Sequence, residues 1–168
     1  MQVCYNANEL RPTLTNLATL LRAQFSATAV KRIIVGQDNE PKIADLPQIQ
    51  LIPESTNVAL SGTAKDIQTR NIRIRAIVSV KANLNQTAGG LDTVSSMLAV
   101  VDLMEKKESS GAFSTASILG VLRNNPTVND QQLFVDDMSV DYSNLENLGF
   151  PNATAEMSCV FTSRNLTK

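Results

Sequence analysis

The 168-residue chain contains no histidine and no tryptophan, and aromatic residues make up only 4% of it. A serine or cysteine nucleophile normally needs a neighbouring base, and that base is most often histidine. We therefore expect no catalytic residue and no enzyme activity. A core without tryptophan has to be built from aliphatic side chains and methionine, and 43% hydrophobic residues are enough to build one.

Cysteine is almost as scarce, since Cys4 and Cys159 are the two cysteines of the chain and lie near its opposite ends. One pair is not the dense framework of a small secreted domain, so a reducing compartment is favoured. Residues 1–6 are polar and lack the basic start and the apolar stretch of about 7–15 residues that a secretory signal needs. The most apolar window, residues 94–104, is shorter than the ~20 residues that cross a bilayer. We expect neither export by this route nor a membrane partner.

An excess of one charge sign is also missing, because 15 basic and 16 acidic residues give a net charge of -1. No overall field draws such a chain onto DNA or onto an acidic membrane. Any contact with nucleic acid must therefore come from a local basic patch.

Two stretches have the apolar spacing of a helix that covers a sheet. In residues 11–27 the apolar side chains recur at steps of three or four, and residues 91–104 follow the same rule. A third segment, residues 114–123, suits either a short helix or a strand. The apolar stripe of the first helix consists of Leu10, Leu14, Leu17, Leu21 and Phe25.

Strands are expected over residues 30–35, 47–53, 72–81, 134–142 and 153–161, with loops over 37–46 and 143–151 and a turn or weak strand over 54–66. Prolines bracket residues 47–53 and favour an edge position for that strand, because proline has no backbone N–H. The last two strands are expected to be antiparallel neighbours. The order of elements predicts one α+β domain over residues 1–168, an antiparallel or mixed β-sheet with two main helices packed on one face.

The residues with metal or nucleophile chemistry form no site in this pattern. Cys159 alternates with other apolar residues, which places its thiol on the core face of its strand. Asp136 and Asp137 point to opposite faces, and Asp141 shares a face with Asp137 about 13 Å away at ~3.3 Å per residue, too far for one ion. The glycine segment at 88–90 is a helix lead-in rather than a phosphate loop. We expect no metal and no cofactor.

The candidate site is a set of basic residues, Arg70, Arg73, Arg75 and Lys81. Arg73, Arg75 and Lys81 alternate with apolar residues of one predicted strand, so they share its polar face. Such a face could contact passing DNA or acidic groups of a neighbouring subunit, but a charged solvent face of a half-buried sheet needs no further purpose, and this interpretation is the favoured one. The charge reversal Arg75→Glu is expected to leave the fold intact, because the side chain points away from the core.

Residues 11–27, 47–54, 70–80, 91–104 and 153–161 follow one another as helix, strand, strand, helix and strand over most of the chain. This layout resembles the tail terminator and neck proteins of long-tailed bacteriophages, small subunits that close a ring on the end of the tail tube. The resemblance implies a virion structural protein, assembled in the host cytoplasm. It implies a homo-oligomeric ring, expected to be a hexamer, that stops growth of the tail tube and joins it to the head connector. Two alternatives stay open: another neck, connector or tail subunit, and a host adaptor or regulatory module of similar fold.

Overall fold

The structure is a computed structural model that describes residues 10–61, 65–79, 81–82, 91–126, 133–142 and 152–166. The helices are α1 (Leu10–Gln24), α2 (Thr93–Glu105) and α3 (Ile118–Asn124), with one 3-10 turn, η1 (Ile43–Asp45). The strands are β1 (Arg32–Val35), β2 (Gln48–Ser61), β3 (Lys65–Ser79), β4 (Lys81–Ala82), β5 (Leu91–Asp92), β6 (Leu133–Asp141) and β7 (Asn152–Leu166). The predicted features at Cys4, at residues 88–90 and at residues 143–151 lie outside the described residues.

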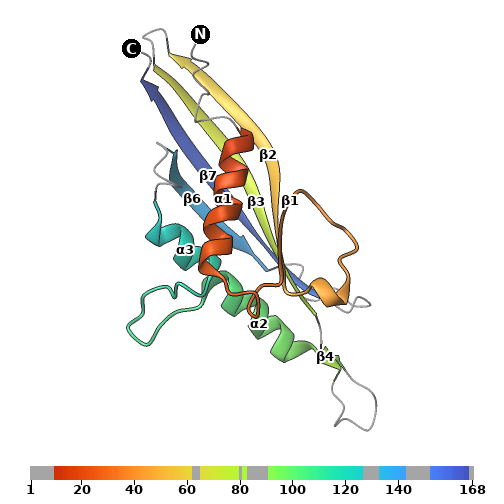
Figure 1. Cartoon of the computed structure of the whole chain (residues 1–168). Coiled ribbons are helices and arrows are strands. Elements are labelled where there is room, and N and C mark those ends of the chain that lie inside the picture. The colour runs from red at the N-terminus through yellow and green to blue at the C-terminus, as the bar shows by residue number, and fades with distance from the viewer. Residues whose placement is uncertain are drawn as a thin grey trace.

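Five strands form one mixed sheet in the order β1-β2-β3-β7-β6 (Figure 1). β1 runs parallel to β2, and the other neighbouring pairs of this sheet are antiparallel. β4 and β5 pair with each other in a separate two-stranded sheet. The α+β fold with a mixed sheet is therefore confirmed, as is the antiparallel pairing of the last two strands, β6 and β7.

The three helices lie on one face of the five-stranded sheet (Figure 1). α1 packs on β1 and β2, α2 packs on β3 and β7, and α3 lies against both α1 and α2. The segment for which the sequence allowed helix or strand is thus a short helix. It begins at Ile118 because Ser117 caps it: the Ser117 Oγ accepts a hydrogen bond from the Gly120 N–H at 3.2 Å.

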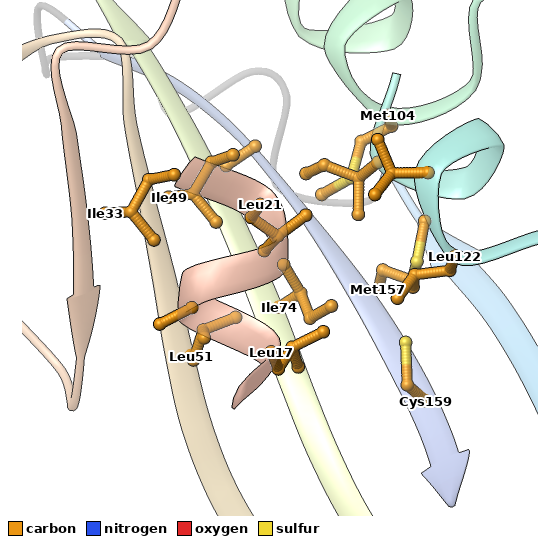
Figure 2. Packing of buried hydrophobic residues seen from close by; sticks show 14 of the residues in the cluster. Leu17, Leu21, Ile33, Ile49, Leu51, Ile74, Met104, Leu122, Met157 and Cys159 are labelled. Carbon is orange, nitrogen blue, oxygen red and sulfur yellow. The ribbon is translucent and has the colours of Figure 1, made fainter. Parts of the chain in front are cut away.

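The predicted apolar stripe of α1 packs on the half of the sheet that contains β1 and β2. Figure 2 shows Leu17 and Leu21 directed toward Ile49, Leu51 and Ile74, and these five side chains are completely buried. They belong to one hydrophobic cluster that also includes residues of α2 and α3. Burying an aliphatic side chain of this size stabilises a fold by about 1.5–3 kcal/mol, so this contact fixes α1 on the sheet.

The other half of the cluster joins α2 and α3 to β7. Met104 of α2, Leu122 of α3 and Met157 of β7 gather in Figure 2 and are fully buried. Cys159 follows on the same face of β7 with 0% of its surface exposed. The prediction that this cysteine belongs to the core is confirmed.

The hairpin of β2 and β3 differs most from the sequence-based expectation. A turn or weak strand is predicted over residues 54–66, whereas β2 continues to Ser61 and β3 already begins at Lys65. The register shifts between Pro53 and Ser55, which marks a bulge that bends β2. The stretch lacks apolar alternation because the hairpin extends past α1, beyond the described helices that cover the rest of the sheet (Figure 1).

The edge position predicted from Pro47 and Pro53 is wrong for the first part of β2. From Gln48 to Leu51 this strand pairs with β1 on one side and with β3 on the other. Pro53 comes just after Leu51, the last residue of β2 that pairs with β1. Proline is tolerated there because β2 has passed the end of its outer neighbour.

Candidate functional site

Arg73 and Arg75 lie on the face of the sheet opposite the helices. They alternate along β3 with apolar residues that are buried under α1 and α2. On the neighbouring strand β7, Glu156 is in register with Arg75. The predicted polar face of β3 is confirmed for these two arginines, and it meets an acidic residue of the next strand.

Glu156 bridges the two arginines, and Glu54 forms a second ion pair with Arg73. Arg75 Nε lies 2.7 Å from Glu156 Oε1, Arg73 Nη1 lies 3.2 Å from Glu156 Oε2, and Arg73 Nε lies 3.3 Å from Glu54 Oε1. The side chains of Arg75 and Glu156 are only 17% and 15% exposed. We call Glu54, Arg73, Arg75 and Glu156 the ion-pair cluster. Its two positive and two negative charges cancel.

This neutralisation changes what the arginines can do. Hydrogen bonds between charged groups at such distances are among the stronger polar contacts of a protein, and partial burial reduces their screening by salt. A phosphate or a partner's carboxylate reaches Arg75 only by competing with Glu156. The ion-pair cluster therefore joins β3 to β7 within the chain and presents little net attraction to DNA.

Arg70 and Lys81 do not join this face. Arg70 is three residues from Arg73, so it points to the helix side of β3, where it is in register with Phe161 and 5% exposed. β3 ends at Ser79, and Lys81 belongs to β4, outside the five-stranded sheet. Of the four predicted site residues, the structure brings together Arg73 and Arg75 alone.

The acidic half of the ion-pair cluster is not recognisable from local sequence. Glu156 alternates with core residues of its strand, which predicts that it faces away from the core. Its partner Arg75, however, is 81 positions earlier in the chain. The available signal is the opposite charge on the polar faces of two strands, and it becomes informative once those strands are known to be neighbours.

The loop between β1 and β2 is held against the same face. Arg32 pairs with Asp45 at 3.0 Å and with Asp38 at 3.7 Å. The Gln50 side chain, in register with Arg75, donates to the backbone oxygen of Asp38 at 2.8 Å and accepts from its N–H at 3.3 Å. A segment that the sequence predicts as a polar loop is thus fixed to the sheet by its own hydrogen bonds.

The remaining features of the described residues that bear on chemistry are Cys159, the acidic side chains and a hollow beside α2. Burial, with a smaller contribution from the negative charge of Asp137, raises the pKa of Cys159 to about 12, so its thiol is neutral. No three acidic or cysteine side chains of the described part approach closely enough to hold a metal ion. A hollow of about 220 Å³ lies beside α2, and its ionisable lining residues are Asp102 and Lys106. This pair does not supply a nucleophile together with a base that would activate it.

Among the described helices, none is long and apolar enough to cross a membrane.

No protein-family model matches the chain, and no curated protein sequence matches it.

Proposed function

We propose that the chain is a non-catalytic virion structural protein, a ring-forming tail terminator that caps the tail tube and joins it to the head connector. Its place is the tail or neck of the virion, with the host cytoplasm as the site of assembly. The succession of helix, β-hairpin, helix and closing strand supports this role. The observation that carries the proposal is the length of the central strands.

These strands extend past the body of the fold. β2, β3 and β7 are 14, 15 and 15 residues long, whereas β1 has 4 residues. Strands of globular proteins are usually about 5–6 residues long. We call residues 57–61, 65–69 and 162–166 the β arm. Figure 1 shows the β arm projecting beyond α1.

A projecting β arm is a natural contact between copies of one chain. After Leu51, the outer side of β2 has no strand neighbour among the described residues. A free strand edge offers its backbone N–H and C=O groups to another chain. When the arm of one copy rests on the body of the next, the contact is heterologous, and such contacts form a ring if the rotation closes.

The neutral ion-pair cluster fits this role better than it fits DNA binding. A subunit of a hexameric ring presents one surface to the tail tube and one to the head connector, and DNA passes through the ring without being held. A non-specific contact with passing DNA would require uncompensated basic residues, and Arg73 and Arg75 already have carboxylate partners.

Native mass spectrometry of the purified chain, alone and mixed with purified tail tubes, tests the proposal. We expect a ring in solution or a monomer that closes into a ring on the tube ends. A chain that stays monomeric with tail tubes present contradicts the terminator role. A host adaptor or regulatory module would behave in that way, whereas another neck or connector subunit would form a ring that does not bind the tube.

A shortened hairpin tests the role of the β arm itself. Asn57 and Thr69 are directly opposite each other, so an Asn-Gly turn in place of residues 58–68 rejoins the strands in register. The replacement removes none of the residues described in the buried cluster, and we expect a folded monomer that no longer closes. Rings formed by this variant at the wild-type yield would show that another surface makes the contact between copies.

A further inference from the structure

The connection between α2 and α3 is a tight hairpin that projects from the helix layer (Figure 1). Lys107 and Phe113 face each other in an antiparallel bridge. The Ser114 N–H donates to the Lys106 oxygen at 2.8 Å, and the Glu108 N–H donates to the Ala112 oxygen at 2.8 Å. These backbone bonds give the hairpin a defined shape.

Gly120 holds α3 against the base of this hairpin. A Cβ atom at Gly120 would lie 1.9 Å from the backbone oxygen of Ser114, so no larger residue fits without a shift. Arg123 follows Gly120 by three positions and lies on the same side of α3. The close approach at Gly120 therefore brings Arg123 to the hairpin.

Two cations meet one aromatic ring at this place. Lys107 Nζ lies 5.1 Å from the centre of the Phe113 ring, and Arg123 Cζ lies 5.4 Å from it. Beside the ring is a hollow of about 180 Å³, lined by Gly111, Ala112, Phe113, Arg123 and Asn124. We call this hollow, together with the two cations on the Phe113 ring, the Phe113 site.

The two cations of the Phe113 site differ from the arginines of the sheet. Arg32, Arg73 and Arg75 each have a carboxylate within 4 Å. Within the described part of the chain, no carboxylate forms an ion pair with Lys107 or Arg123. Both residues are exposed, and the contact with the ring holds each charge near the hollow while leaving it accessible to an anion.

We propose that the Phe113 site binds the carboxylate side chains of an acidic segment of a partner protein. The hollow accepts one glutamate or aspartate side chain, with the lining residue Arg123 as its charge partner and the Asn124 amide as a further donor. Lys107 does not line the hollow, but its contact with the Phe113 ring supplies a second positive charge. A protein segment fits better than DNA, because the net charge of -1 supplies no field for a polyanion and two cations neutralise few phosphates. The proposal holds whether or not the chain forms a ring.

Titration of the full chain with a synthetic peptide rich in glutamate, followed by NMR through the amide signals of the hairpin, tests this site. We expect saturable shifts of Gly111, Ala112 and Phe113, and none with a matched peptide in which every glutamate is glutamine. The variants Arg123→Gln and Lys107→Gln should each weaken binding about fivefold, the effect of one partly exposed charge pair.

The control variant is Lys42→Gln, which removes the same charge from an exposed position before η1. It should change the affinity less than twofold. Arg123→Lys keeps the charge and should retain most of the binding, which protects the test if Arg123→Gln folds poorly. The proposal is overturned if the glutamate peptide shifts no hairpin signal, if Lys42→Gln weakens binding as much as Arg123→Gln, or if a short DNA duplex binds the site more tightly than the peptide.

Discussion

The Arg75 Nε of β3 donates a hydrogen bond of 2.7 Å to Glu156 Oε1 of β7. These two residues are 81 positions apart in the chain. The same carboxylate accepts from Arg73 Nη1 through its other oxygen at 3.2 Å. Glu156 is therefore the shared counter-charge of both arginines. Its loss leaves two neighbouring positive charges with Glu54 as their remaining carboxylate in the cluster.

Replacement of this carboxylate by its isosteric amide measures how much the ion-pair cluster contributes to the free energy of unfolding. Glu156→Gln should lower the free energy of unfolding by on the order of 2 kcal/mol, because the charged hydrogen bonds are lost and the two arginines repel each other. Urea unfolding followed by circular dichroism gives this value. Glu40→Gln, which makes the same change of net charge at an exposed position, should stay within about 0.5 kcal/mol of the wild type. Equal stability of the two variants would mean that solvent already screens the cluster.

Charge reversal at Arg75 now has a different expected outcome from the one that the sequence suggests. The strand pattern predicts that Arg75→Glu leaves the fold intact, but the new carboxylate would lie beside Glu156. We expect a larger loss of stability than in Glu156→Gln, since like charges replace an attraction. The double variant Arg75→Glu with Glu156→Arg should recover part of it in the same unfolding experiment. No recovery would show that packing around the guanidinium matters more than charge.

The contact between α3 and the hairpin predicts a strong effect of one methyl group. Gly120→Ala places a Cβ 1.9 Å from the Ser114 oxygen, so α3 has to move, at a cost on the order of 2 kcal/mol or more. Gly111→Ala is the matched control, because nothing lies within 4 Å of a Cβ built at this position. Its φ of +82° is unfavourable for alanine and should lower the free energy of unfolding by ~1 kcal/mol. Thermal unfolding compares the two. A Gly120→Ala variant no less stable than Gly111→Ala would contradict the close approach.

The cap of α3 can be tested separately from its packing. The Ser117 Oγ accepts from the Gly120 N–H at 3.2 Å and donates to the Ser114 oxygen at 2.8 Å. Ser117→Ala should cost about 1 kcal/mol of unfolding free energy, the usual worth of an N-cap. Thr115→Ala, at an exposed position of the same turn, should have little effect. Hydrogen exchange of the first α3 amides should accelerate in Ser117→Ala alone.

Cys159 should be protected from thiol reagents as long as the fold persists. In a Cys4→Ser background, labelling at pH 8 should proceed at the rate of unfolding, because the buried thiol is neutral and out of contact with the reagent. Fast labelling of the native protein would show that the core face of β7 is wrongly assigned.

The same thiol predicts a loss of stability at alkaline pH. Burial first, and the charge of Asp137 second, raise the pKa of Cys159 from 9.0 to about 12. The folded state therefore holds its proton more tightly than the unfolded chain. The contribution of this thiol is complete below about pH 9 and falls as the pH rises from about 9 to about 12. The pH dependence of the unfolding free energy should be less steep in this range for Cys159→Ala than for the parent; identical slopes would refute the assignment.

Periodicity along the chain is enough to predict much of this fold. The leucine spacing of residues 11–27 places Leu17 and Leu21 on one side of a helix, and the structure buries both. The alternation in residues 72–81 separates the core residues of β3 from Arg73 and Arg75, and that division is correct as far as Ser79. Such patterns are readable because the direction of a side chain follows from the local geometry of a helix or strand.

What periodicity leaves open is which segments become neighbours. The polar face of β3 looks like a basic stripe until β7 is placed beside it and Glu156 falls opposite Arg75. Lys81 drops out of the stripe because β3 ends at Ser79, and β2 is internal as far as Leu51 because β1 pairs with its outer side. Strand order and register depend on the packing of the whole core, in which each helix and strand buries its apolar face against others distant in the sequence. Local side-chain patterns correctly suggest the pairing of β6 with β7, but they do not determine the order and register of the whole sheet. The charge of the sheet surface depends on which strands become neighbours, and only the folded chain decides that.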